Sequence, residues 1–310
     1  MNKENKIVFI LGPTAVGKTA VGIALAKKLN GEIISCDAMQ VYDKIFIASN
    51  KPGLEEMNGV PHHLVGGISM DENFDVARFL KVANPLIDDI LKRNRSVIVS
   101  GGTGMYARAL LDGIFEIDDI PQEIGEQLEK EAREKGLDYL YQELSSVDQR
   151  SAARIHPHDE RRILRALEVY RAAGVPISSL QETSSGLWGK RPVMIFGLDM
   201  DRDWLYERIN ARVEKMFEDG LIEEVAKIQG VEVSRTACAI IGLKEVGGYL
   251  AGKCTLQEAK EEMKKNTRRL AKRQLTWFRA DQRIKWVLIG RDQTVEQITN
   301  QIIREVMNAG

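Results

Sequence analysis

A segment of eight residues near the amino terminus carries the residue types that bind phosphate. Residues 12–19 read GPTAVGKT, which matches in full the pattern of a phosphate-binding loop, or P-loop. Glycines let backbone N–H groups curve around an anion, and the N-terminus of a following helix adds partial positive charge. Lys18 can reach the terminal phosphates, and the Thr19 hydroxyl can bind Mg²⁺. The pattern predicts a diphosphate or triphosphate site formed by Gly12, Pro13, Thr14, Ala15, Val16, Gly17, Lys18 and Thr19.

The residues on either side of this loop fit its usual setting. Residues 6–11 read KIVFIL, a short β-branched and aromatic run that is typical of a buried parallel strand. After the loop, Val21, Leu25 and Leu29 repeat at helical spacing, and the Asn30-Gly31 pair supplies a helix stop. Strand, glycine-rich loop and helix therefore occur in the required order, which argues against a chance match.

An aspartate follows the next strand-like run. Residues 32–36 read EIISC and lead into Asp37. Because ligands of an open α/β sheet bind at the carboxyl ends of its strands, we expect Asp37 beside the P-loop. Asp37 is either the N-cap of a helix or a base that takes a proton from, or orients, the group that attacks the phosphate-bearing substrate. The residues alone leave both interpretations open.

A third strand candidate ends in glycines where many P-loop proteins have an acid. Residues 96–100 read SVIVS and are followed by Gly101 and Gly102. A P-loop protein that hydrolyses its nucleotide usually ends this strand with an acidic Mg²⁺ ligand. The glycines favour a group-transfer enzyme whose second substrate lies over them, and a tight strand-to-helix turn is the alternative. Between these strands, residues 73–93 predict a helix with a buried stripe of Phe79, Val82, Leu86 and Ile90.

The middle of the chain has a different character. We interpret residues 116–190 as a helical insertion domain, and residues 1–115 with 191–310 as one α/β core whose parallel sheet is flanked by helices. Within the insertion, Arg161, Arg162 and Arg165 gather near the start of a predicted helix. They form a solvated face with local salt bridges, a phosphate clamp for a small substrate, or contacts to an RNA backbone.

Two later segments also carry basic residues. Arg208 and Arg212 share one face of a predicted helix, so one of them can bind a diphosphate bidentately if this helix packs beside the P-loop. A plain surface charge is the alternative. Residues 264–285 hold nine basic residues and one acid, with Trp277 among them. This mixture is typical of a nucleic-acid-binding surface, and a basic helix that packs its tryptophan inward is the alternative.

Composition limits the remaining possibilities. The 310 residues include 44 basic and 45 acidic side chains, which excludes a uniformly basic coat but allows local basic patches. Cys36, Cys238 and Cys254 have no paired metal-ligand spacing, so we expect no zinc site and a reduced, cytoplasmic protein. No apolar stretch approaches the roughly 18 residues of a membrane span, so we expect no membrane association.

Taken together, these segments resemble the tRNA dimethylallyltransferases, also called tRNA isopentenyltransferases. The resemblance runs along essentially the whole chain, and several of the matching segments are long. They are GPTAVGKT (12–19), IISCDAMQVY (33–42), KP (51–52), GVPHHL (59–64), SGGTGMY (100–106), ARIHPHDERRILRALEVYRAAG (153–174), LYERINARVEKMFEDGLIEEV (205–225), IIGLKEV (240–246) and TRRLAKRQLTWFR (267–279).

The resemblance implies a P-loop NTPase-like fold and a monomeric enzyme with Mg²⁺ as cofactor. Such an enzyme transfers a dimethylallyl group from dimethylallyl diphosphate to the exocyclic amine of the adenosine just 3′ of the anticodon, in tRNAs that read codons beginning with U. The loop would then hold a prenyl diphosphate, although its motif is of the ATP type. The resemblance implies Asp37 as base, Thr19 near Mg²⁺ and Arg212 on the departing pyrophosphate. It also implies tRNA contacts by Asp37, Ala38, Met39, Gln40, Thr103, Arg161, Arg162 and Arg165.

The sequence departs from the family pattern at two positions expected to face tRNA. Family members usually have Gln in place of Arg161 and Arg in place of Gly125. Two other functions compete with the transferase. One is a small-molecule P-loop kinase in which Asp37 positions an acceptor hydroxyl, against which the basic and aromatic carboxy-terminal segment argues. The other is a tRNA-binding module with an inactive P-loop, against which the intact Lys18 and Arg212 argue.

Overall fold

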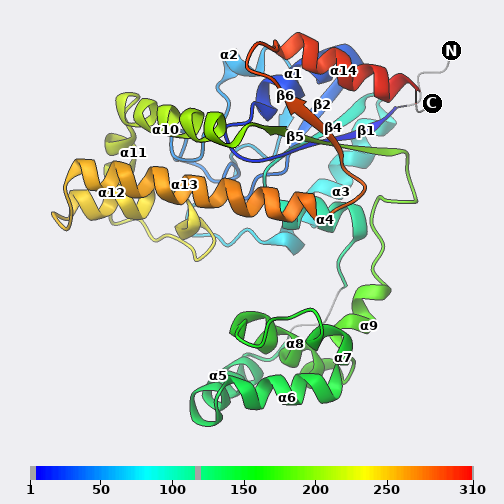
Figure 1. Ribbon diagram of the computed structural model, residues 1–310, viewed down its shortest axis with the longest axis vertical. Coiled ribbons are helices and arrows are strands. Elements are labelled where there is room, and N and C mark those ends of the chain that lie inside the picture. The colour runs from blue at the N-terminus through cyan, green and yellow to red at the C-terminus, as the bar shows by residue number, and fades with distance from the viewer. Residues whose placement is uncertain (1–4, 116–119, 309–310) are drawn as a thin grey trace. The chain divides into compact units, whose positions relative to one another are not determined.

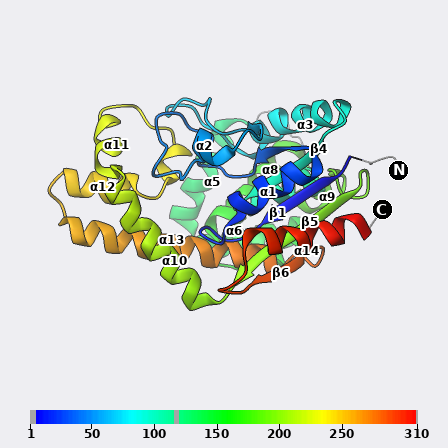
Figure 2. The same cartoon turned by 90° about the horizontal axis from the view of Figure 1, so that it is seen from above.

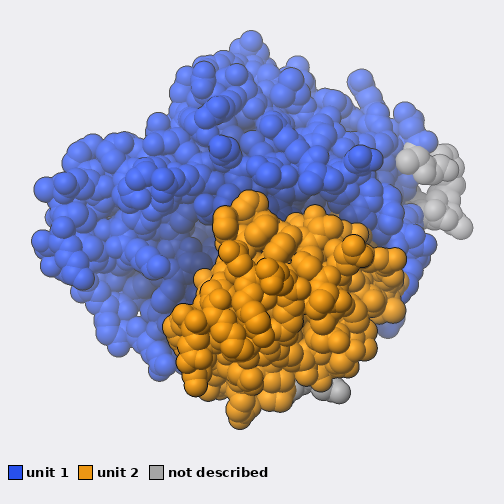
Figure 3. Space-filling view, turned by 60° about the horizontal axis from the view of Figure 1, so that its bottom comes forward, with its two compact units in different colours: residues 1–110, 188–310 blue, residues 111–187 orange. Residues whose placement is uncertain are grey.

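The computed structural model describes residues 5–115 and 120–308. The chain divides into two compact units, residues 1–110 with 188–310 and residues 111–187, which Figure 3 distinguishes by colour. We expected the insertion to run from residue 116 to residue 190. The structural unit runs from residue 111 to residue 187, so both of its boundaries lie a few residues earlier. Residue 116 itself lies outside the described residues.

The first unit is built on a six-stranded parallel sheet in the order β3-β2-β4-β1-β5-β6 (Figure 1). Strands β1, β2 and β4 are buried almost throughout. Because both faces of these strands are covered, β1 and the centre of β4 are apolar runs rather than alternating patterns, and β2 buries Ile33 and Ile34 beside Glu32, which pairs with Arg93 and Arg95. The strands are β1 (Ile7–Leu11), β2 (Gly31–Ser35), β3 (His62–His63), β4 (Ser96–Gly101), β5 (Val193–Met200) and β6 (Lys285–Ile289).

Helices cover both faces of this sheet. In Figure 1, α1 and α14 lie on one face, and α3 and α4 lie on the other. The helix α1 begins directly at the P-loop lysine and ends before Asn30, whose left-handed backbone provides the expected stop. The helices with at least part of their length in this unit are α1 (Lys18–Leu29), α2 (Leu54–Met57), α3 (Val76–Lys92), α4 (Gly104–Asp112), α10 (Arg202–Glu218), α11 (Leu221–Lys227), η1 (Ala237–Ala239), α12 (Leu243–Leu250), α13 (Leu256–Arg279) and α14 (Val295–Asn308).

Helices α10 to α13 extend beyond the carboxyl ends of the strands, as Figures 1 and 2 both show. They have an apolar core of their own, formed by Val213, Leu221, Val225, Val246 and Met263. These helices therefore form a wall next to the sheet edge at which a ligand of an α/β protein binds.

The strand register brings three loops together at that edge. Leu11 at the end of β1 pairs with Gly101 at the end of β4, and Ser35 at the end of β2 pairs with Ser100. The P-loop, the Asp37 segment and the segment at residues 102–104 follow these strand ends. Because the three strands are neighbours in the sheet, the loops that leave them are also neighbours.

The second unit is helical, as the sequence predicts. Its apolar core includes Leu128, Leu140, Leu144, Ile163 and Leu167. The helices of this unit are α5 (Gln122–Lys135), α6 (Leu137–Val147), α7 (Gln149–Ala152), α8 (Glu160–Ala173) and α9 (Ile177–Glu182).

Candidate active site

The P-loop has the backbone conformation of an anion-binding turn. Gly17, immediately before α1, has φ 106°, and Ala15 has φ 67°. The left-handed region suits glycine, which has no Cβ to clash. No side chain caps the N-terminus of α1. Its first N–H groups are therefore left for a ligand, and the helix dipole favours a negatively charged one.

Lys18 folds over this loop. Its ammonium group donates hydrogen bonds to the carbonyl oxygens of Gly12 (3.0 Å) and Pro13 (2.8 Å). Burial lowers the pKa of Lys18 from 10.5 to about 8, the charge of Asp37 raises it, and Arg212 lowers it further. Lys18 is therefore a cation at neutral pH whose proton is held less tightly than that of a surface lysine.

Arg208 and Arg212 of α10 both contact the P-loop, as one of the two sequence interpretations requires. The Arg212 guanidinium donates to the Thr14 hydroxyl (3.3 Å), and Arg208 Nε donates to the Ala15 carbonyl (2.9 Å). Arg212 also lines the pocket described below, and burial together with the charge of Arg208 lowers its pKa. Arg212 is thus the arginine placed to meet a diphosphate bidentately.

Asp37 is followed directly by a turn at residues 38–41 and not by a helix, so the helix-cap interpretation is wrong. Its Oδ1 accepts a hydrogen bond from the backbone N–H of Met39 (2.9 Å). Burial raises the pKa of the Asp37 carboxyl, while the Met39 N–H and the Lys18 charge act in the opposite direction. A carboxylate that binds a proton more readily than usual is suited to act as a general base.

Two hydrogen bonds of Thr103 join the Asp37 segment to the loop after β4. Its hydroxyl accepts a hydrogen bond from the Ala38 N–H (3.0 Å), and its own N–H donates to the Cys36 carbonyl (3.1 Å). A side chain at Gly101 would overlap the Cys36 carbonyl group. The glycine at the end of β4 is therefore required by this close approach of two backbones.

Helix α13 packs on the other glycines of the same loop. A Cβ on Gly102 would collide with the Gln274 side chain, and a Cβ on Gly104 would lie 3.1 Å from the Trp277 ring. Gln274 accepts a hydrogen bond from the Thr14 N–H (2.8 Å) and donates one to the Gly102 carbonyl (3.0 Å). Gln274 is a site residue that we did not identify from the sequence. The feature that could have indicated it is an uncharged amide within an otherwise basic segment.

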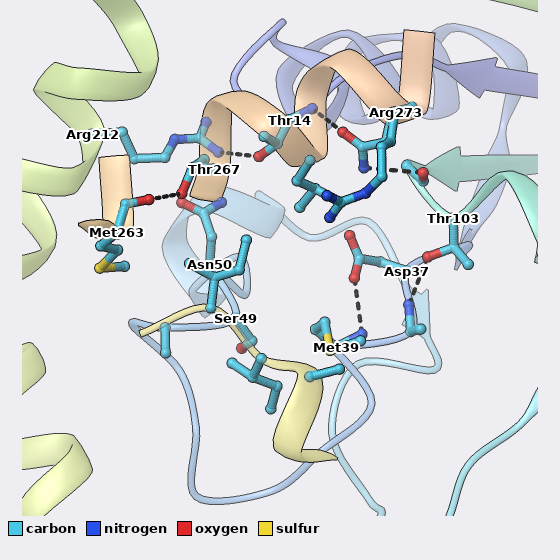
Figure 4. Close-up of a pocket in the computed structure, with 18 of the residues that line it drawn as sticks. Thr14, Asp37, Met39, Ser49, Asn50, Thr103, Arg212, Met263, Thr267 and Arg273 are labelled. Carbon is cyan, nitrogen blue, oxygen red and sulfur yellow. Dashed lines mark hydrogen bonds between the residues drawn. The ribbon is translucent and has the colours of Figure 1, made fainter. Parts of the chain in front are cut away.

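Several of these groups line one pocket of about 390 Å³, shown in Figure 4; Thr14 is the P-loop residue among them, whereas Lys18 and Arg208 are not part of its lining. Thr14 and Arg212 lie on one side of it, and Asp37, Met39 and Thr103 lie across from them. Much of the remaining wall is apolar. It includes Ala48, Met105, Val213, Met216, Ile240, Ile241, Met263 and Leu270. A cavity with a cationic end, a carboxylate and apolar walls fits an amphiphilic ligand that has an anionic head and a hydrocarbon tail.

The residues expected to face tRNA lie in both units. Asp37, Ala38, Met39 and Thr103 line the pocket. The Gln40 amide is engaged within the protein, since it accepts a hydrogen bond from the Ser35 hydroxyl and donates one to the Asn50 carbonyl.

The remaining three lie on α8 in the second unit. Arg161, Arg162 and Arg165 have exposed side chains, and the last two pair with Asp159 and Glu168. Their contacts with RNA stay a prediction.

The basic carboxy-terminal segment is partly neutralised. Lys264 pairs with Glu214, and Arg279 pairs with Asp199. Arg273 and Trp277 line the pocket instead, and Trp277 is 41% exposed. An inward-packed tryptophan is therefore the wrong interpretation of this helix, whose buried face carries residues such as Met263, Ala271 and Phe278.

Two further expectations concern metals and membranes. Residues 5–115 and 120–308 contain no group of three or more histidine, cysteine or acidic side chains that could hold a metal ion. Among the helices of the same residues, none is long and apolar enough to cross a bilayer.

Comparisons with known proteins agree on one family. Residues 40–281 match the family model described as IPP transferase. The tRNA dimethylallyltransferase of Carboxydothermus hydrogenoformans is 47% identical over 97% of both chains, and that of Geobacter sulfurreducens is 42% identical over 92% of both.

Solved structures show the same relationship. The tRNA isopentenylpyrophosphate transferase of Bacillus halodurans has a TM-score of 0.71 at 41% identity over 98% of both chains. A eukaryotic dimethylallyltransferase acting on tRNA has a TM-score of 0.83 at 28% identity, over 98% of this chain and 79% of the other. With an α/β P-loop core, a helical unit and these relatives, the chain belongs to the IPP transferase family, the tRNA dimethylallyltransferases.

Proposed function

We propose that the chain transfers a dimethylallyl group from dimethylallyl diphosphate to the exocyclic amine of the adenosine 3′ of the anticodon, in tRNAs that read codons beginning with U. The observation that carries this proposal is the composition of the pocket. A P-loop, an arginine and a buried carboxylate share one cavity with apolar side chains. The apolar side chains suit the five-carbon hydrocarbon part of the donor.

The cationic end of the pocket binds the diphosphate of the donor. The uncapped N–H groups at the start of α1, the Lys18 ammonium and the Arg212 guanidinium all carry positive or partial positive charge. Residues 12–19 supply the backbone groups that surround the phosphates. The apolar walls exclude water from the five-carbon group, which protects an allylic centre from hydrolysis.

The transfer exchanges one bond for another. The adenosine amine attacks the first carbon of the dimethylallyl group, the bond from that carbon to oxygen breaks, and diphosphate leaves with the electron pair. Asp37 takes the proton that the amine loses. Lys18 and Arg212 stabilise the negative charge that grows on the leaving group, and such electrostatic stabilisation is usually the largest contribution to catalysis.

The residues of the P-loop fit a bound Mg²⁺. Thr19 offers its hydroxyl in the first turn of α1, directly after the lysine. In P-loop proteins the hydroxyl at this position binds Mg²⁺, and the ion usually keeps several waters and binds substrate phosphates. When bound, the ion neutralises part of the charge of the diphosphate.

The acceptor is the anticodon stem-loop of tRNA. The target adenine must leave its base stack to enter a pocket, which costs a few kcal/mol. We propose that Asp37, Ala38, Met39, Gln40 and Thr103 contact the tRNA beside the P-loop, the first of them at the adenine, and that Arg161, Arg162 and Arg165 contact its backbone. Arginines on an exposed helix face suit phosphate contacts, which position the RNA without reading its sequence.

The decisive experiment mixes the purified protein with an anticodon stem-loop and dimethylallyl diphosphate labelled in its hydrocarbon part. We expect label in the RNA, and none when guanosine replaces the target adenosine. Parallel reactions contain γ-labelled ATP with or without RNA. Transfer of γ-phosphate to an acceptor, with no prenyl label in the RNA, would replace the transferase with the kinase alternative.

A further inference from the structure

A glutamate outside the pocket is bonded to three consecutive backbone N–H groups of a pocket loop. Glu224 lies on α11, and its Oε2 accepts hydrogen bonds from Phe46 (2.6 Å) and Ile47 (2.8 Å). Its Oε1 accepts a third from Ala48 (2.9 Å). Successive N–H groups of this kind form a concave site for an anion, and here a carboxylate of the same chain occupies it.

The loop held in this way forms one wall of the pocket. Ala48, Ser49 and Asn50 all line the cavity. The Ser49 hydroxyl donates to the Ile45 carbonyl (2.7 Å), so the loop is also tied to the buried Ile45. Glu224 does not line the cavity, so any influence that it has on the reaction passes through this loop.

The far end of the loop is joined to the segment that follows Asp37. The Gln40 side chain donates a hydrogen bond to the Asn50 carbonyl (3.0 Å) and accepts one from the Ser35 hydroxyl (2.8 Å). A chain of contacts therefore runs from Glu224 through residues 46–50 to Gln40. These contacts end at Gln40, one of the residues proposed to contact the tRNA. The P-loop is held by other hydrogen bonds, which come from Arg208, Arg212 and Gln274.

We propose that Glu224 is a positioning residue for the RNA acceptor, because it holds the wall at residues 48–50 and, through Asn50, the turn that carries Gln40. This inference rests on the proposed function. Hydrogen bonds to a charged acceptor are stronger than those to a neutral one. A glutamine at position 224 would keep the size of the side chain, lose the charge and turn one acceptor oxygen into a donor that faces an N–H group.

The test compares E224Q with E223Q. Glu223 is the neighbouring residue of α11 and its side chain is exposed, so its variant has the same change in charge without touching the loop. Steady-state rates are measured while the stem-loop RNA and dimethylallyl diphosphate are varied separately. We expect E224Q to raise the KM for RNA about tenfold, the effect of losing one hydrogen bond to a charged group. The KM for the donor should change less than the KM for RNA, because Arg212 and the P-loop, which hold the donor's diphosphate, have no hydrogen bond to this loop.

Hydrogen exchange supplies a readout that does not depend on activity, and its wild-type arm does not depend on any variant. In the wild-type protein, the amides of residues 46–48 should exchange slowly although the Phe46 side chain is 60% exposed. In E224Q these amides should exchange faster, while amides in β1 and β4 keep their protection. General destabilisation would instead speed exchange throughout the sheet and change both KM values.

The outcomes separate this inference from the proposed function. A wild-type protein that leaves the RNA unlabelled defeats the proposed function. With an active wild type, equal KM values for RNA in E224Q and E223Q would overturn the positioning role. Rapid exchange of the amides of residues 46–48 in the wild type would overturn it independently, because those bonds would then not hold the loop.

Discussion

The side-chain amide of Gln274 joins the backbone of Thr14 to the loop that follows β4. Its oxygen accepts a hydrogen bond from the Thr14 N–H (2.8 Å), and its nitrogen donates to the Gly102 carbonyl (3.0 Å). An amide can accept and donate at once, whereas a carboxylate only accepts and an ammonium only donates. Gln274 of α13 therefore adds to the strand pairing a direct link between the P-loop and the loop next to Asp37.

Replacing Gln274 with Met keeps the size of the side chain and removes both hydrogen bonds. The buried Gly102 carbonyl and the partly buried Thr14 N–H then lose their partner, at a cost of about 1–3 kcal/mol for each one that water cannot reach. We expect a lower melting temperature and a kcat/KM reduced for both the donor and the RNA. Gln257→Met on the same helix is the control, because Gln257 is exposed and its side chain donates to Glu261 on the same helix. An unchanged melting temperature in Gln274→Met would show that the amide does not join the loops.

Local patterns in the sequence account for the centre of the fold. Strands β1, β4 and β5 are mostly apolar, β2 has two isoleucines at its centre, and α1 follows a complete P-loop motif. Their meeting at one edge follows from the parallel order of the sheet, so the position of Asp37 beside Lys18 was predictable. The partners of Gln274 and Glu224 were not, because these contacts join residues 260 and 178 positions apart.

The buried face of α3 was predicted only in part. The sequence suggested Phe79, Val82, Leu86 and Ile90, but Val82 is 38% exposed and Leu86 is only partly buried. The prediction selected the large side chains, whereas the helix packs through a face that includes a small one. The residues that α3 buries are Phe79, Leu80, Ala83, Ile87 and Ile90.

Asp37→Asn tests the base. Asparagine keeps an oxygen that can accept the Met39 N–H, so the turn should remain intact while the capacity to take a proton is lost. We expect kcat to fall by roughly 10²–10⁴, the usual contribution of a general base, with little change in the dissociation constant for RNA. Asp71→Asn, a change at an exposed carboxylate, serves as the control. A loss of RNA binding as large as the loss of kcat would argue against the role of a base.

The pH dependence of donor capture should report Lys18. Burial lowers its pKa to about 8 in the free protein, so the ammonium is charged below that pH and becomes neutral above it. We therefore expect kcat/KM for dimethylallyl diphosphate to fall as the pH rises through about 8, since this parameter reflects the free enzyme. In Lys18→Arg the charge persists to a much higher pH, so the alkaline decline should disappear. A decline that is identical in both proteins would assign it to another group.

The proposed RNA contacts of Arg161, Arg162 and Arg165, on the exposed face of α8, are tested by placing an arginine at position 125. This glycine lies in α5, and a side chain there would reach towards the carboxylate of Glu168, which pairs with Arg165. Gly125→Arg therefore places another cation near the proposed phosphate contacts. Replacing a glycine within a helix also stabilises the helix, by up to about 1 kcal/mol.

We expect Gly125→Arg to bind the stem-loop more tightly and with a steeper dependence on salt, by roughly one unit of slope for one added phosphate contact. Gly125→Gln is the matched control, because it gains the helix propensity without the charge. Binding is measured by titration at several salt concentrations. If the two variants gain equally, or if the salt dependence of Gly125→Arg equals that of the wild type, this face of the second unit does not contact the RNA backbone. Arg165→Ala should shift the slope in the opposite direction, since it removes a cation from the same face.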